Sequence, residues 1–128
     1  MATIIANKSC GNAPKKKFIL DFLTAVANME IEAAMDMLED DAQLNIVSRT
    51  SYTGKDKIKD LIIKDGARSK ITKLEIDKIL SHGKYCAANG LMYFEDGSKV
   101  AFNNMYTFRS HSKKARLKLI ETYFLIIH

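Results

Sequence analysis

The chain has 128 residues, of which 47% are hydrophobic and 27% are charged, and its formal net charge is +5 at pH 7. This length suits one domain with its own core, and the composition excludes disordered and fibrous classes. No apolar run approaches the roughly 20 residues that span a bilayer, and the apolar start is too short for a secretory signal. We therefore expect a cytoplasmic protein that makes no membrane contact.

The basic residues do not point to nucleic acid. Lysines are scattered over residues 15–17, 55–59 and 113–118, and no aromatic residues interleave with them. A base-stacking surface needs such aromatic side chains within a basic groove. The spread is typical of solvated helix and turn surfaces, so nucleic acid is not an expected partner.

The cysteines and histidines predict neither a metal site nor a cofactor. Cys10 lies in the N-terminal segment and Cys86 in a strand-like run, which fits no disulfide framework. We expect Cys86 to be a buried thiol and Cys10 an exposed one. His82 and His111 fall in turns, without a carboxylate at the spacing of a dyad or a metal site. The roles of Cys10 and His82 stay open.

Residues 1–12 are read as an N-terminal arm and residues 13–128 as the only domain. Asn12 and Pro14 predict a helix start with Asn12 as the cap. Phe18 and Phe22 begin an apolar stripe at helical spacing, and a second short helix follows over residues 31–38.

A short strand is predicted over residues 42–48, followed by a third helix. Thr53 and Asp56 have the spacing of a capping box, in which each side chain bonds the backbone at the other's position. Ile58 and Leu61 then supply the buried face of the helix.

The second half of the chain has the character of strands. Four runs are separated by turn residues, at 71–80, 85–94, 99–108 and 116–127. Consecutive hairpin-linked runs predict an antiparallel meander. Helices followed by such a meander predict an α+β fold with the helices on one face of a curved sheet.

The last run is apolar on both alternations. By alternation, two sets of apolar residues lie on opposite faces. One face holds Leu117, Leu119, Tyr123 and Leu125, and the other holds Ile120, Phe124 and Ile126. Helices can cover only one face, and large exposed apolar patches mark interfaces. We therefore expect a homodimer through the outer face of the sheet.

The order of these elements resembles a known superfamily. Two helices, "EDDAQLNIV", the helix start "TGKDKI" and four hairpin-linked strands are similar to nuclear transport factor 2, ketosteroid isomerase and the SnoaL-like polyketide cyclases, over residues 13–127. The stretches "GNAPKK", "HGKYCAANG" and "FNNMYTF" resemble small, uncharacterised bacterial SnoaL-like proteins. The resemblance implies a cone-like, cystatin-like fold. Three N-terminal helices pack on a strongly curved, mostly antiparallel sheet around an apolar pocket.

The same resemblance leaves enzymatic activity open. The isomerases shuttle a proton with a carboxylate and stabilise the enolate with a phenol and a protonated carboxyl. Phe22 falls at the place of the phenol, Asn45 or Ile46 at that of the base, and Asn104 at that of the carboxyl. None of these side chains can act as an acid or a base.

The expected pocket lies between the first helix and the sheet. Its predicted lining is Phe18, Phe22, Tyr52, Phe102, Asn104 and Tyr106. Asn104 is either a ligand-orienting amide beside the Tyr106 phenol or a core amide bonded to its neighbours. Both readings place it on the inward face of its strand.

Two further candidates stand beside the pocket. Glu121 is either a catalytic carboxylate in an apolar wall or an outer-face residue paired with a lysine. Asn12, Lys15 and Lys16 lie at the start of the first helix, where free N–H groups attract anions. They form either an anion site or a solvated face.

Two functions follow from these residues. The first is binding of a small, mostly apolar ligand in an internal pocket, with or without isomerase-like or cyclase-like proton transfer. The alternative is a non-catalytic, dimeric interaction module. A contact with an anion or a nucleic acid through the first-helix lysines is a third hypothesis. The sequence names no substrate.

Overall fold

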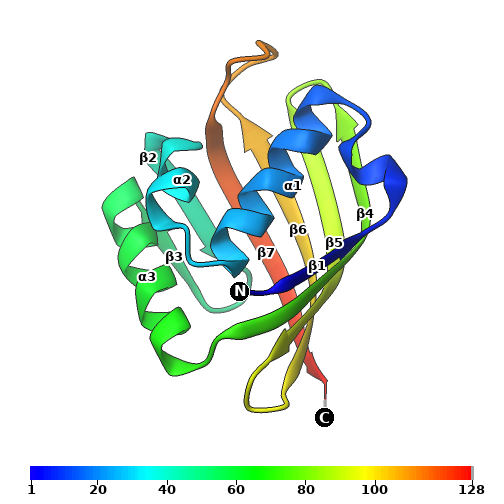
Figure 1. Cartoon of the computed structure of the whole chain (residues 1–128). Coiled ribbons are helices and arrows are strands. Elements are labelled where there is room, and N and C mark those ends of the chain that lie inside the picture. The colour runs from blue at the N-terminus through cyan, green and yellow to red at the C-terminus, as the bar shows by residue number, and fades with distance from the viewer. Residues whose placement is uncertain (128) are drawn as a thin grey trace.

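Seven β-strands and three α-helices make up the computed structural model, which describes residues 1–127 (Figure 1). A 3-10 turn, η1 (Lys8–Gly11), precedes the helices α1 (Pro14–Ala27), α2 (Ile31–Asp36) and α3 (Lys55–Arg68). The strands are β1 (Thr3–Ala6), β2 (Leu38–Ile46), β3 (Thr50–Thr53), β4 (Ile71–His82), β5 (Tyr85–Phe94), β6 (Lys99–Phe108) and β7 (Leu117–Ile127). No helix in this part of the chain is both long and apolar enough to cross a membrane.

The first helix begins at Pro14, where the missing N–H and the fixed φ of proline are favourable. Its cap is Ala13 rather than the predicted Asn12, and Ala13 is extended (φ −148°, ψ 153°). The ring of a proline clashes with a helical residue before it, so α1 cannot start earlier. Asn12 instead accepts a hydrogen bond from Lys16 Nζ through its Oδ1 (3.2 Å).

The third helix begins without the predicted capping box. Thr53 is the last residue of β3 and pairs with Gln43 of β2, which holds it in the sheet. Gly54 takes the cap position with a φ of +99°, a conformation that suits glycine. Its N–H donates to the carbonyl oxygen of Ala42 (2.8 Å), so β3 leads directly into α3.

All seven strands form one mixed sheet in the order β1-β4-β5-β6-β7-β2-β3. The strands from β4 to β7 are the predicted antiparallel meander, and β2 and β3 form a further antiparallel hairpin. The pairs β1–β4 and β2–β7 are parallel, which the expectation of a mostly antiparallel sheet did not include. Strands β1 and β3 were not predicted, so α3 follows a hairpin of two strands where one strand was expected.

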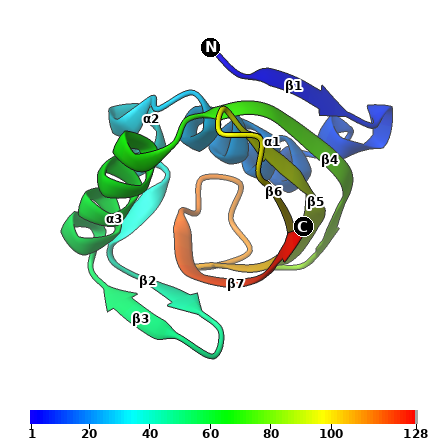
Figure 2. The same ribbon diagram turned by 90° about the horizontal axis from the view of Figure 1, so that it is seen from below.

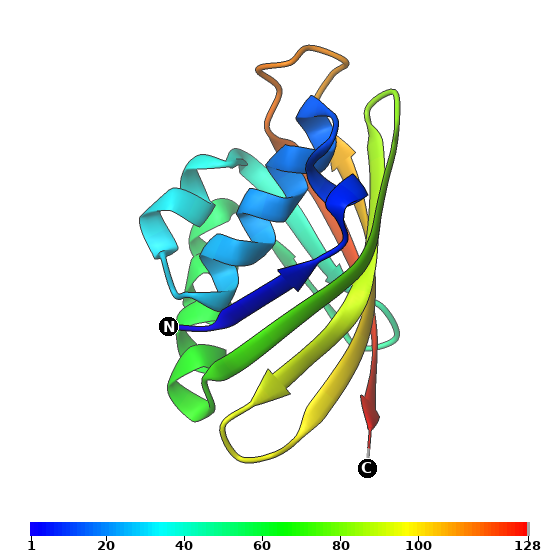
Figure 3. The ribbon, with the colours of Figure 1, turned by 45° about the vertical axis from the view of Figure 1, so that its right-hand side comes forward.

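The sheet curves, and the helices lie on its concave side (Figures 1 and 3). We call the end where α1 begins and the β6–β7 loop lies the apex. The opposite end, formed by the C-terminal part of α3 with the β2–β3 and β5–β6 hairpins, is the mouth. Figure 2 views the molecule from the side of the mouth.

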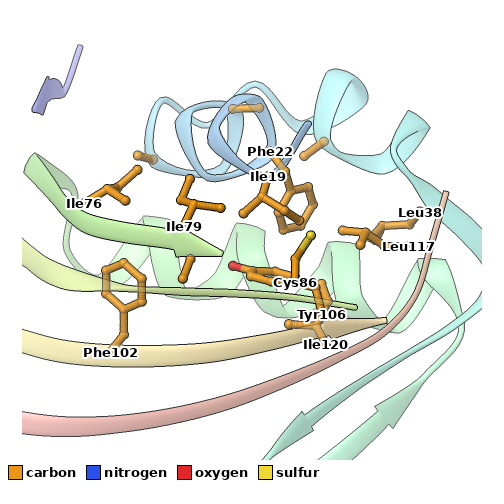
Figure 4. Close-up of a cluster of buried hydrophobic side chains, with 14 of the residues drawn as sticks. Ile19, Phe22, Leu38, Ile76, Ile79, Cys86, Phe102, Tyr106, Leu117 and Ile120 are labelled. Carbon is orange, nitrogen blue, oxygen red and sulfur yellow. The ribbon is translucent and has the colours of Figure 1, made fainter. Parts of the chain in front are cut away.

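Aromatic side chains fill the space between α1 and the sheet. The rings of Phe18 and Phe108 meet edge to face with centroids 5.0 Å apart, and those of Phe22 and Tyr106 do so at 6.4 Å. Figure 4 shows Phe22 and its neighbour Ile19 facing the buried side chains of the sheet. The apex is therefore a packed core.

Both cysteines are free, buried thiols. The prediction for Cys86 is confirmed, and burial raises the pKa of its thiol to about 11, although Lys15 and Lys16 oppose part of that rise. The prediction of an exposed Cys10 is wrong, because its side chain has no accessible surface. The N-terminal segment packs on the domain, since β1 joins β4 and η1 brings Cys10 into the core.

Candidate functional site

A cavity of about 630 Å³ opens at the mouth, and we call it the mouth cavity. Small-molecule sites in proteins have volumes of roughly 300–1,000 Å³. Figure 2 shows the elements around it: α3, the β2–β3 hairpin, the β5–β6 hairpin and the end of β7. Its lining residues are Ile46, Arg49, Thr50, Tyr52, Leu61, Lys64, Asp65, Arg68, Ser69, Phe94, Asp96, Ser98, Val100 and Phe124.

The inner wall of the mouth cavity is apolar. Strands turn alternate side chains to the same face, and on the inner face this brings Phe94, Val100 and Phe124 to the cavity. All three are half-buried. Tyr52 of β3 adds an aromatic ring with a hydroxyl group. A few polar groups in an apolar wall are the usual composition of a ligand site.

Positively charged side chains line the cavity beside this apolar wall. The guanidinium carbon of Arg49 lies 4.8 Å from the centroid of the Phe124 ring, a cation–π contact. Lys64 and Arg68 line the same cavity from α3, four residues apart and hence on one side of the helix. Positively charged side chains therefore border the cavity on two sides, from the β2–β3 turn and from α3.

Two carboxylates also line the cavity. Asp96 in the β5–β6 turn accepts hydrogen bonds from the hydroxyl of Ser98 (2.6 Å) and from its N–H (2.9 Å). These bonds, the hydroxyl one first, hold the pKa of Asp96 below its ordinary value. Asp96 is therefore ionised and bound within its own turn. Asp65 of α3 is the other carboxylate.

A smaller pocket of about 190 Å³ adjoins the mouth cavity and shares Asp65, Ser69 and Phe94 with it. Met29 lies over Gly66 at its edge, where a Cβ on Gly66 would stand only 2.4 Å from Met29 Cε. The hydroxyl oxygen of Ser69 is buried and has no hydrogen-bond partner among the described residues. A buried, unpaired hydroxyl is a polar group that a ligand can satisfy.

Asn104 lies deeper on the inner face of β6, in a small polar network. Its Nδ2 donates to the hydroxyl oxygen of Tyr106 (2.9 Å), and the hydroxyl of Thr122 donates to its Oδ1 (2.5 Å). Asn104 and Thr122 are directly opposed in the β6–β7 register. Burial raises the pKa of Tyr106 well above its ordinary range, although the bond from Asn104 opposes this, so the phenol stays neutral.

Solved structures share this architecture. An NTF-2 like protein of unknown function from Burkholderia xenovorans superimposes with a TM-score of 0.75 at 16% identity, over 90% of this chain and 85% of that one. A candidate SnoaL-like polyketide cyclase from Shewanella denitrificans gives 0.75 at 11% identity, over 87% and 90% of the two chains. A candidate ketosteroid isomerase from Kribbella flavida gives 0.76 at 8% identity, over 94% and 84%. No family model and no curated protein matches the sequence.

This chain has the NTF2-like fold. The resemblance seen in the sequence is thereby confirmed for the fold, including the α+β class and the curved sheet. At these identities the likeness carries no activity, because one fold hosts many functions.

Within this NTF2-like fold, the predicted pocket residues separate into two groups. Tyr52 lines the mouth cavity. Phe22, Phe102 and Tyr106 are buried in the packed core, and Phe18 packs against Phe108 beside them. The space predicted between α1 and the sheet is filled, because the helix lies close enough for aromatic rings to meet across it. Asn104 is half-buried between Phe102 and Tyr106 on the inner face of β6, and it is not among the residues that line the mouth cavity.

Two further candidates, Glu121 and Asn45, lie on the outer face of the sheet. Glu121 pairs with Met105 in the register, and Met105 is exposed on the outer face of the sheet. Asn45 is on that same face, opposite Glu121, and its Oδ1 accepts a hydrogen bond from the hydroxyl of Ser51 (3.3 Å). Neither side chain reaches the inside of this NTF2-like fold. A bulge between Thr107 and Phe108 separates Glu121 from the buried Leu117, which the simple alternation had placed on its face.

The lysines at the start of α1 have partners within the protein. Lys15 Nζ donates to the carbonyl oxygen of Ser112 (2.9 Å) and lies 4.7 Å from the Phe108 ring centroid. Lys16 bonds Asn12, and Lys17 forms an ion pair with Asp21 (2.6 Å). These contacts connect α1 to the apex loop and stabilise lysines at the positive end of the helix dipole. The anion site at Asn12, Lys15 and Lys16 stays a prediction.

Sequence reasoning missed the residues that form the rim of the cavity, above all Arg49, Lys64 and Phe124. Lys64 and Arg68 share one side of a predictable helix, which was the signal that could have found them. Arg49 gave no such signal, because its place depends on a turn between β2 and β3 that was not predicted. His82 is exposed at the end of β4, away from the lining residues. Among residues 1–127, no group of three His, Cys, Asp or Glu side chains could hold a metal ion.

Proposed function

We propose that this NTF2-like domain binds a small, mostly apolar molecule in the mouth cavity. The observation that carries the proposal is the volume of about 630 Å³ behind an apolar wall of aromatic and aliphatic side chains. A site of this size buries most of a drug-sized molecule. The space between α1 and the sheet offers no such cavity among the described residues, because aromatic pairs occupy it.

Polar groups near the wall would orient the ligand. Tyr52 and Ser69 lie in the lining. Ile46 also lines the cavity, and its neighbour in the β2–β7 register is Thr122, the partner of Asn104. The half-buried Asn104 keeps a second N–H that can donate to a carbonyl oxygen. We therefore propose Asn104, which lies next to the lining rather than in it, as a binding group behind the floor of the site.

Proton transfer is the further part of the proposal, since neighbours of this fold include proteins named as a candidate polyketide cyclase and a candidate ketosteroid isomerase. Asp96 is committed to the hydrogen bonds of its turn, which leaves Asp65 as the carboxylate for such chemistry. Proton exchange at a carbon beside a carbonyl would appear as deuterium uptake from D₂O by NMR. An Asp65→Asn variant that retains the full exchange rate would exclude this role.

The binding proposal is tested by thermal-shift screening with steroids and polyketide-like acids. Val100→Trp should fill the cavity and abolish the stabilisation that a bound ligand provides, which for a ligand at a hundredfold excess over its Kd is about 2.7 kcal/mol. Ile63→Trp is the matched control, because Ile63 is exposed on α3 and lies outside the lining. Equal shifts in both variants would reject the cavity as the site.

The alternative, a dimeric interaction module, is favoured by one observation. The convex face of the sheet carries exposed apolar side chains, Leu80, Met105, Tyr123 and Leu125, which we call the outer patch; Leu125 is 71% exposed. Such a patch marks an interface. Lys78 lies at its β4 side and Glu121 at its β7 side. A two-fold axis running between β5 and β6 would bring Lys78 of one copy toward Glu121 of the other.

Light scattering during size-exclusion chromatography tests the dimer. The wild type should have twice the mass of the chain, Glu121→Lys should dissociate it through like-charge repulsion, and adding Lys78→Glu should restore it. Asp36→Lys at the exposed end of α2 is the control for the change in net charge. A monomeric wild type at every concentration would reject self-association through the outer patch.

A further inference from the structure

The cations of the mouth cavity outnumber its carboxylates. Arg49, Lys64 and Arg68 line the cavity, and none of them takes part in an ion pair within residues 1–127. Asp65 and Asp96 are the acidic residues of the lining, so positive charges outnumber negative ones. Asp96 is further occupied by the hydrogen bonds of its own turn. The rim is therefore positive beside an apolar wall.

Arg49 is exposed at the rim, and its guanidinium group lies over an aromatic ring of the cavity wall. Its guanidinium carbon lies 4.8 Å from the centroid of the Phe124 ring, and its backbone N–H donates to the carbonyl oxygen of Ile46 (2.9 Å), which closes the turn. Ser48, just before it, has a φ of +70°, an unfavourable conformation for a residue with a side chain. The turn between β2 and β3 thus adopts a strained shape that places Arg49 over an apolar residue of the cavity.

Lys64 and Arg68 carry like charges close together at the rim. Like charges four residues apart on a helix repel each other. The negative end of the α3 dipole offsets part of this repulsion, because both residues lie near the C-terminus of the helix. A negative group in the cavity would offset the remaining repulsion between Lys64 and Arg68. It would lie between these two cations and Arg49.

We propose that the ligand of the mouth cavity is an amphipathic organic anion, with a carboxylate head on an apolar body. The inference rests on the proposed function and names its ligand class. The head binds at the rim, where a guanidinium donates two parallel N–H bonds to a carboxylate while its face stays on an aromatic ring. The body lies along Phe124, Val100 and Phe94, where burial removes apolar surface from water.

The test compares decanoate with decan-1-ol, which has the same chain and no charge, by NMR titration of the ¹⁵N-labelled protein at pH 7. We expect decanoate to bind wild type about tenfold more tightly, because the two ligands differ only in the charge-assisted bonds. Arg49→Gln should reduce this difference, because decanoate loses a charge-assisted bond that decanol does not make. Arg116→Gln, an exposed arginine at the apex, is the matched control and should retain the difference.

A second variant, Lys64→Gln with Arg68→Gln, should weaken decanoate binding by a smaller factor, which measures the share that α3 contributes. Equal affinity of wild type for the two ligands, or a preference unchanged in Arg49→Gln, would overturn the anion inference and leave cavity binding intact. Absence of shifts in the lining residues with either ligand would instead reject the proposed function, and this inference with it.

Discussion

Asn104 is a polar residue on an inner strand face whose other members are apolar. Tyr106 and Thr122 satisfy its amide through the two hydrogen bonds described above. The amide in turn provides a hydrogen-bond partner to the hydroxyl of Tyr106, which is 1% exposed. Both readings of Asn104 are therefore compatible with the structure, since a bonded amide still has one N–H to offer.

Replacing Asn104 with leucine should destabilise the protein by about 1–3 kcal/mol, because the buried hydroxyl of Tyr106 loses its partner. Adding Tyr106→Phe removes that hydroxyl and should recover part of the loss. Urea unfolding of the wild type, both single variants and the double variant measures the coupling. Additive effects of the two substitutions would show that the hydrogen bond contributes nothing to stability.

The strand β4 bends at a bulge, and this bend shapes the sheet. The register with β5 shifts between Ile76 and Lys78, and Asn89 of β5 accepts a hydrogen bond from the N–H of Lys78 (3.1 Å). Gly90 stands opposite the bulge, where a Cβ would lie 1.9 Å from the carbonyl oxygen of Glu75. The backbones of β4 and β5 thus approach each other more closely than any side chain allows. Bulges of this kind increase the curvature of a sheet.

Gly90→Ala should therefore destabilise the protein by about 2 kcal/mol or more, because the obstructing atom belongs to the backbone and cannot move aside. Gly97→Ala is the matched control in the β5–β6 turn. It meets nothing within 4 Å and loses only the left-handed freedom of its φ of +89°, which costs about 1 kcal/mol. Urea unfolding measures the loss of unfolding free energy in both variants. A smaller loss for Gly90→Ala than for Gly97→Ala would show that the close approach of the backbones does not exclude a side chain at residue 90.

The molecule as a whole is filled at the apex and open at the mouth. Helix α1 covers the inner face of the sheet where Phe108 is 1% exposed. Toward the mouth, α3 and the two hairpins leave the cavity in which Phe124 is only half-buried. One sheet thus provides stability at one end and a binding surface at the other.

Truncating an aromatic residue at each end should separate these roles. Phe108→Ala creates an enclosed void and should cost about 3–5 kcal/mol of unfolding free energy. Phe124→Ala enlarges a space that is already open, so its cost should be about 1 kcal/mol, and ligand binding should weaken instead. Urea unfolding and NMR titration of the two variants measure both quantities. Equal destabilisation would contradict an open mouth.

Much of the fold was predictable because its signals are local. Alternation and turn residues predicted strands at 85–94 and 99–108 with the observed bounds, and the spacing of Phe18 and Phe22 predicted α1. β1 and β3 were not predicted because each has only four residues. β1 pairs with β4, which is far along the chain, and β3 pairs with β2 across a turn that was not predicted. Cys10 was misjudged for the same reason, since β1 and η1 bring it into the core.

The inward face of β6, the apolar stripe of α1 and the antiparallel meander follow from the order of residues alone, because periodicity decides which side of an element is apolar. Which inward residues stay uncovered is a different matter. It depends on where α1 and α3 lie against the curved sheet, and so on contacts between residues far apart in the chain. For that reason Tyr106 is core, Tyr52 lines the cavity and Arg49 stands at its rim, a division that the tertiary structure alone decided.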